Sequence, residues 1–126
     1  LGHSDADVLI HSICDALLGA ANLGDIGKHF PDTDPKYKGV DSKALLKEVM
    51  ILIRENGYEL GNLDSTICLE TPKIGSYISQ MQEALSDCMG VNKDLLSIKA
   101  TTTEKLSFVG REEGVSAYAT VLIQRN

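Results

Sequence analysis

The fold class is decided by the stretch Asn62-Leu-Asp-Ser-Thr-Ile-Cys-Leu-Glu70, which alternates between apolar and mostly polar side chains. Leu63, Ser65, Ile67 and Leu69 fall on one side of an extended backbone. A period of two predicts a β-strand with one face turned toward a core. Because such a face must be covered, we expect helices with an apolar stripe on either side of this stretch in the sequence.

Upstream, the sequence predicts a helix over 5–23. Ser4 is placed to cap it, with Asp7 in the third position of a capping box. Apolar side chains then recur at the three- and four-residue spacing of a helix, and Gly24 is a natural stop.

The remaining elements alternate between helix and strand. We expect a loop over 24–39, a second helix that Asp41 or Ser42 caps and Gly57 ends, a third helix over 74–89, a short strand after Asp94, a turn-rich connection over 101–110 and a final strand over 115–124. The order α, α, β, α, β, β predicts an α/β (α+β) fold, with a small β-sheet packed by helices. We expect residues 1–126 to form a single domain.

Composition excludes several classes of function. The 126 residues are 43% hydrophobic and 24% charged, with a formal net charge of -6, so we expect no nucleic-acid surface. No apolar run approaches the ~18 residues of a membrane span, so we expect no membrane partner. Cys14, Cys68 and Cys88 form no CxxC pair and are interpreted as small apolar residues in a reducing cytosol.

Three stretches carry residues suited to chemistry. On the first helix, Asp7, His11 and Asp15 follow at i, i+4 and i+8 and share one face. An imidazole between two carboxylates suits a metal ligand with supporting groups. The alternative is a surface histidine between solvated acids. Since a catalytic zinc needs three protein ligands, any such site must be completed elsewhere.

The second stretch, 24–34, reads Gly-Asp-Ile-Gly-Lys-His-Phe-Pro-Asp-Thr-Asp. Its glycines allow a backbone to approach a ligand closely, and its acids suit diol hydroxyls or a divalent ion. The alternative is a polar loop made of turn residues.

The third stretch, 99–105, reads Lys-Ala-Thr-Thr-Thr-Glu-Lys. Threonine hydroxyls and backbone N–H groups bind phosphate oxygens, and Glu104 suits a hard cation that bridges two phosphates. A strand end followed by a helix cap is the alternative. Thr71-Pro72-Lys73 is a weaker candidate of the same kind.

Taken together, four blocks resemble the 2-C-methyl-D-erythritol 2,4-cyclodiphosphate synthase family. They are His-Ser-Asp-Ala-Asp-Val-Leu-Ile-His at 3–11, Asp-Ala-Leu-Leu-Gly-Ala-Ala at 15–21, the loop at 24–34 and Lys-Ala-Thr-Thr-Thr-Glu-Lys-Leu at 99–106. The resemblance covers essentially the whole chain and includes Thr-Pro-Lys at 71–73 and Phe-Val-Gly-Arg at 108–111.

The resemblance implies a reaction and an assembly. The 2-phosphate of 4-diphosphocytidyl-2-C-methyl-D-erythritol 2-phosphate attacks the β-phosphorus of the diphosphate, which gives the cyclic diphosphate and CMP. This makes the enzyme a phosphorus–oxygen lyase of non-mevalonate isoprenoid biosynthesis. The family fold is a small mixed sheet with helices on one side. It forms a homotrimer with the sheets facing the three-fold axis and the active sites between subunits.

The resemblance also implies residue roles. His3 and Thr102 match stabilisers of the transition state, His11 matches a zinc ligand, and Glu104 matches the ligand of a second ion, Mg²⁺ or Mn²⁺. Substrate contacts are expected at His3, Ser4, Asp25, Ile26, Gly27, Phe30, Pro31, Asp32, Thr33, Asp34, Leu69, Thr71, Pro72, Lys73, Ile74, Gly75, Thr101, Thr102, Thr103, Glu104, Phe108 and Arg111.

One departure is visible. The family's other two zinc ligands form an Asp-x-His pair in N-terminal strands that lie upstream of Leu1 in the resemblance, so we expect the domain to lack those strands here. The expected location is the cytoplasm, or a plastid if a transit peptide precedes the chain. The alternatives are a non-catalytic trimer that binds cytidine nucleotides, and a different phosphoryl-transfer enzyme on the same scaffold.

Overall fold

The computed structural model describes residues 2–31, 41–69, 77–101 and 115–126. Its longest element is helix α1 (Gly2–Ala20), which begins three residues before the predicted start. The expected cap at Ser4 is wrong, because Ser4 already lies inside the helix. The helix also ends earlier than Leu23. Asn22 takes a left-handed backbone with a φ of 59°, and it stops the helix before Gly24 is reached.

The predicted loop over 24–39 contains one turn of helix, α2 (Ile26–His29). Sequence spacing missed it because four residues give no periodicity. Its signal was the cap: Asp25 accepts a hydrogen bond from the backbone N–H of Lys28 at 3.0 Å. The rest of that predicted loop, 32–39, lies outside the described residues.

The second long helix, α3 (Ser42–Glu55), confirms the predicted start and end. Asp41 is its N-cap and accepts from the backbone N–H of Lys43 at 2.9 Å. Gly57 follows with a φ of 89°, a left-handed conformation that glycine adopts readily. The predicted third helix is α4 (Ile78–Met89), and Gly90 in the left-handed region ends it. Residues 74–76 of that prediction lie outside the described part.

Three strands form one sheet in the order β2-β1-β3. Strand β1 (Tyr58–Cys68) is central and pairs parallel with β2 (Leu96–Thr101), which a short 3-10 turn, η2 (Lys93–Leu95), precedes. On its other side β1 pairs antiparallel with β3 (Ser116–Arg125). The sheet is therefore mixed, as expected, and the predicted final strand is correct to within one residue. Of the predicted connection over 101–110, residues 102–110 lie outside the described part.

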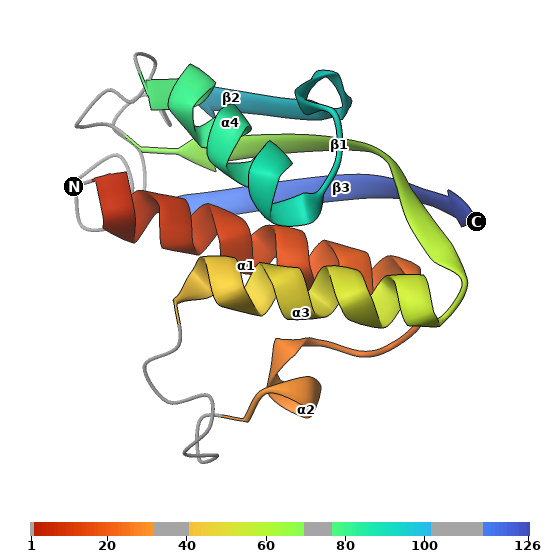
Figure 1. Ribbon diagram of the computed structural model, residues 1–126. Coiled ribbons are helices and arrows are strands. Elements are labelled where there is room, and N and C mark those ends of the chain that lie inside the picture. Colours follow the sequence, from red (N-terminus) through yellow and green to blue (C-terminus); the bar gives the residue numbers. More distant parts are fainter. Residues whose placement is uncertain (1, 32–40, 70–76, 102–114) are drawn as a thin grey trace.

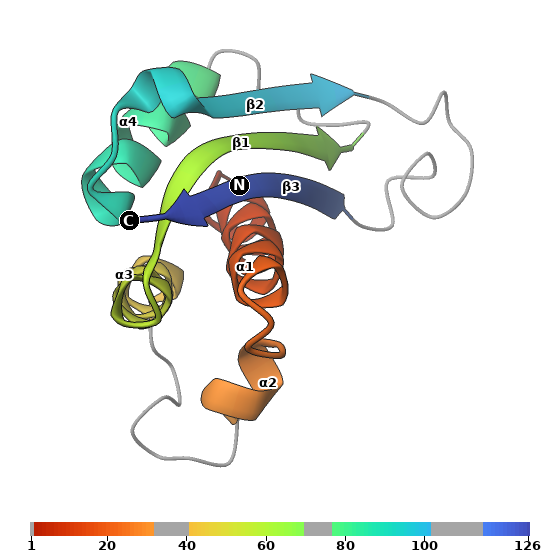
Figure 2. The ribbon, with the colours of Figure 1, turned by 90° about the vertical axis from the view of Figure 1, so that its right-hand side faces the viewer.

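Helices α1, α3 and α4 cover one face of this sheet (Figures 1 and 2). Leu63, Ser65 and Ile67 of β1 are buried against them, which confirms the alternation in the sequence. The core is almost wholly aliphatic and is filled from α1 and α3 by Leu9, Ile13, Leu17, Leu18, Leu46, Val49, Met50 and Ile53. The opposite face of the sheet has no covering element among the described residues, and Tyr118 and Leu122 of β3 stand exposed there.

No helix in the described ranges is both long and apolar enough to cross a membrane.

Candidate functional site

Most of the predicted site residues that the structure describes lie on α1 or on and next to the short helix α2. His3 and Ser4 fall in the first turn of α1. His11 lies two turns further on, and its side chain is exposed. Within the described part of the chain His11 has no hydrogen-bond or ion-pair partner. An exposed, uncommitted imidazole fits the role of a metal ligand.

The two carboxylates on the His11 face are engaged elsewhere. Asp7 accepts a hydrogen bond from the hydroxyl of Ser42, the first residue of α3. Asp15 accepts one from the backbone N–H of Ile26, the first residue of α2, at 2.9 Å. The hypothesis that both acids support His11 therefore receives no support from these contacts. Sequence reasoning could not have found their partners, because those partners lie 35 and 11 residues away.

The predicted diol-binding segment, Asp25 to Gly27, forms the start of α2. The carboxylate of Asp25 caps the helix, and a Cβ on Gly27 would lie 3.5 Å from that same carboxylate. The ring of His29 is hydrogen-bonded to the carbonyl of Leu23, which ties the end of α2 to the chain before it. Sequence analysis gave His29 no role. The turn is therefore held by side chains on both of its flanks.

Two further predicted residues meet at the carboxyl ends of the parallel strands. The backbone N–H of Leu69 donates to the carbonyl of Thr101 at 3.0 Å. Leu69 is buried, whereas Thr101 is exposed at the end of β2. Carboxyl ends of parallel strands are common ligand-binding positions in sheets covered by helices. In Figure 1 these strand ends point toward the same end of the molecule as the start of α1.

Other predicted contacts divide into two groups. Phe30 packs into the hydrophobic core and is only 9% exposed, while Pro31 next to it is exposed. Thirteen of the predicted site residues lie outside the described residues: Asp32, Thr33, Asp34, Thr71, Pro72, Lys73, Ile74, Gly75, Thr102, Thr103, Glu104, Phe108 and Arg111.

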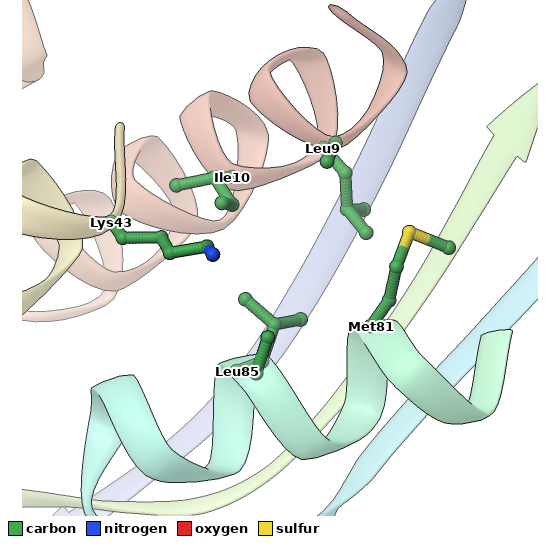
Figure 3. A pocket seen from close by; sticks show the side chains of 7 residues that line it. Leu9, Ile10, Lys43, Met81 and Leu85 are labelled. Atoms are coloured by element: carbon green, nitrogen blue, oxygen red, sulfur yellow. The ribbon is translucent and has the colours of Figure 1, made fainter. Parts of the chain in front are cut away.

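A small pocket between α1, α3 and α4 is too confined to be this site (Figure 3). Its volume of about 30 Å³ leaves room for no more than about two water molecules. The lining is apolar apart from one lysine and consists of Ala6, Leu9, Ile10, Lys43, Met81, Ala84 and Leu85. A nucleotide needs a pocket roughly ten times larger.

A metal site needs several ligand side chains close together. Among residues 2–31, 41–69, 77–101 and 115–126, no group of three His, Cys, Asp or Glu side chains is arranged to hold an ion. His11 thus fits as one ligand of a set that these ranges do not complete.

The mixed three-stranded sheet with helices on one face defines a small α+β protein, and its first helix carries the exposed imidazole of His11. The chain belongs to the YgbB family, whose match covers residues 1–124. This confirms the predicted resemblance.

Individual relatives agree with the family. Over 125 residues the chain is 64% identical to the 2-C-methyl-D-erythritol 2,4-cyclodiphosphate synthase of Bacteroides fragilis. The matched region covers 99% of this chain and 79% of that protein. The fold matches a 2C-methyl-D-erythritol-2,4-cyclodiphosphate synthase in its CDP-bound form with a TM-score of 0.86 and 37% identity, over 98% of this chain and 80% of that one.

A third relative is longer. The bifunctional IspDF from Campylobacter jejuni matches with a TM-score of 0.92 and 44% identity over 98% of this chain. The present chain spans about a third of that protein, 34% of its length.

Proposed function

We propose that this chain is a 2-C-methyl-D-erythritol 2,4-cyclodiphosphate synthase, a phosphorus–oxygen lyase of non-mevalonate isoprenoid biosynthesis. The observation that carries the proposal is the 64% identity to the Bacteroides fragilis enzyme over 125 residues. The substrate is 4-diphosphocytidyl-2-C-methyl-D-erythritol 2-phosphate, and the products are the cyclic diphosphate and CMP. A cytidine ligand is supported by the CDP-bound relative, which shares this fold.

The chemistry needs positioning more than it needs a base. The 2-phosphate is already a nucleophile near neutral pH, so the step is the attack of one anion on another within a single molecule. Because both phosphates belong to one substrate the step is unimolecular, and the task of the protein is to hold the two groups in line. Tethering and orientation together can remove up to about 7–11 kcal/mol of a barrier. In this proposal His3 and Thr102 stabilise the charge that develops on the reacting phosphates, and Asp25 to Gly27 hold the diol.

Divalent ions are part of the proposal. His11 would hold one, Zn²⁺, as one ligand of its set, and Glu104 would hold Mg²⁺ or Mn²⁺. When bound, such ions offset the repulsion between the phosphates and polarise the attacked phosphorus. The exposed imidazole of His11, without a partner in the described ranges, supports its share of this assignment.

A homotrimer with active sites between subunits is also proposed. Within one chain Asp25 is tied through Ile26 to Asp15, near the end of α1. The carboxyl ends of β1 and β2, where Leu69 pairs with Thr101, lie instead toward the end of the molecule where α1 begins (Figure 1). His3 and Asp15 are separated by about 18 Å along the helix axis. A second subunit could bring its own strand ends to the diol side. Tyr118 and Leu122, 66% and 64% exposed on the open face of the sheet, supply an apolar surface for such contacts.

The proposed location is the cytoplasm. The three cysteines are free thiols in the described structure, and Cys14 is fully buried, which suits a reducing compartment. The relative from Bacteroides fragilis is a bacterial protein.

The test is turnover by the full-length protein with Zn²⁺ and Mg²⁺. CMP release is followed by chromatography, and the second product by phosphorus NMR. We expect CMP and the cyclic diphosphate in equal amounts. Binding of cytidine nucleotides without ring closure would instead support a non-catalytic module, and a non-cyclic product would support a different phosphoryl transfer.

A pair of variants tests the role of Glu104. Glu104→Ala should lower the rate by about two orders of magnitude, since a bound ion stabilises the transition state by several kcal/mol. Glu48→Ala, which removes an exposed acid from α3, is the control and should leave the rate unchanged. Equal rates for both variants would remove Glu104 from the proposed metal site.

A further inference from the structure

Two carboxylates of α1 hold the first residues of α2 and α3. Asp15 accepts a hydrogen bond from the N–H of Ile26 at 2.9 Å, and Asp7 accepts one from the hydroxyl of Ser42. Asp7 and Asp15 lie two turns apart, with His11 between them. The face of α1 that carries the exposed imidazole therefore also fixes where α2 and α3 begin.

The contact at Ile26 is the more informative of the two. The first N–H groups of a helix have no partner within the helix, so they need one from outside. In α2 the cap residue Asp25 satisfies the N–H of Lys28. The N–H of Ile26 is left over, and a carboxylate 11 residues back in the sequence accepts it.

We propose that Asp15 is a positioning residue for the substrate diol. It lies one helical turn after His11 on α1 and acts through the backbone of Ile26, which fixes the turn Asp25 to Gly27. This inference rests on the proposed function, which assigns that turn to the methylerythritol hydroxyls. The role needs the acceptor oxygen of Asp15 and not its charge, and Asp15 itself does not touch the substrate.

The second anchor of the turn acts from the other side. The ring of His29 is hydrogen-bonded to the carbonyl of Leu23, so α2 is held both at its first and at its last residue. Because His29 keeps the end of α2 in place, loss of the Asp15 contact should loosen the turn without releasing it. A graded loss of substrate affinity is therefore expected, and not a collapse of the fold.

The experiment compares Asp15→Ala with Asp15→Asn in the full-length protein. The alanine variant lacks the acceptor, and KM should rise by up to about tenfold while kcat changes little, as for one lost hydrogen bond that serves binding. The asparagine variant keeps an amide oxygen at the same place and should restore KM to within about twofold of wild type. Asp87→Ala, an exposed acid on α4, is the control.

A readout independent of turnover accompanies the kinetics. Hydrogen exchange at the amide of Ile26 should accelerate in Asp15→Ala and remain slow in Asp15→Asn. An asparagine variant as impaired as the alanine variant would overturn the proposal, because charge would then be the cause. Unchanged KM in Asp15→Ala beside an active wild type would overturn it too, whereas an inactive wild type would overturn the proposed function itself and the kinetic role of Asp15 with it.

Discussion

Arg54, in the last turn of α3, donates hydrogen bonds to both carboxylate oxygens of Glu59 in β1, from Nε at 2.8 Å and from Nη2 at 2.9 Å. The same Nη2 also donates to the carbonyl of Met89 at 2.8 Å, at the end of α4. The guanidinium of Arg54 thus connects α3 with β1 and with the end of α4. The hydrogen bond from Arg54 also holds the pKa of Glu59 below its ordinary value of 4.5, against the opposing effect of partial burial.

Removing the charge of Glu59 should therefore destabilise the protein in a pH-dependent way. Since the folded-state pKa is lowered, the stabilisation is present above the ordinary pKa and is lost as pH falls through the lowered value. For Glu59→Gln we expect a loss of about 1 kcal/mol at pH 7, because the pair is one-third exposed and screened by solvent. Urea unfolding between pH 7 and pH 3 should show the difference shrinking toward acid; a constant difference would contradict this account.

Substitutions at a buried and at an exposed position of α3 should differ in their effect on stability. Leu46 is fully buried and Ile51 is 50% exposed on the same helix. Leu46→Ala should lower the free energy of unfolding by about 2–5 kcal/mol, because the core keeps part of the cavity. Ile51→Ala should change it by no more than about 0.5 kcal/mol. Denaturant midpoints at one fixed protein concentration provide the measurement, and similar losses at both positions would be inconsistent with the described core.

Two glycines predict opposite effects of the same substitution. Gly61 lies at the irregularity between Leu60 and Asn62 in β1, and a Cβ there would come within 2.9 Å of the carbonyl oxygen of Leu122. Gly61→Ala should cost about 1–3 kcal/mol through overpacking against backbone. Gly19, in the last turn of α1, has open space around it. Gly19→Ala should stabilise by about 0.5 kcal/mol, and melting temperatures should move in opposite directions.

Charged substitutions on the uncovered face of the sheet should test the proposed trimer. Tyr118→Lys combined with Leu122→Lys places two charges on that face, and burying unpaired charges is costly. Sedimentation velocity should show wild type at three times the monomer mass and the double variant as monomer. Ile51→Lys, which charges an equally large exposed apolar position on α3, should remain trimeric. A monomeric wild type would refute the assembly.

The thiol of Cys14 should not react with thiol reagents in the folded protein. Burial raises its pKa to about 12, with smaller contributions from Asp15 and Cys88. At pH 8 a maleimide should therefore label Cys14 only after unfolding, as peptide mass spectrometry would detect. Because the unfolded thiol ionises near 9 and the folded one near 12, stability should also fall as pH rises between these values. Rapid labelling of Cys14 under native conditions would show that α1 opens readily.

Interactions between residues close in sequence were enough to predict several secondary-structure elements of this protein. The alternation of Leu63, Ser65 and Ile67 determined a strand with one buried face, and Asp41 determined the start of α3, because side-chain direction and helix caps depend on near neighbours. The family resemblance was likewise contained in short blocks of sequence, and the YgbB match confirms it.

Tertiary structure alone decided the partners of the acids beside His11. Their helical spacing suggested support for the imidazole, but Asp7 binds Ser42 and Asp15 binds the backbone of Ile26. It also decided that one turn of helix interrupts the loop and that β1 lies between β2 and β3. These outcomes depend on contacts between residues distant in sequence, since a hydrogen-bonding group takes whichever partner the packed chain brings to it.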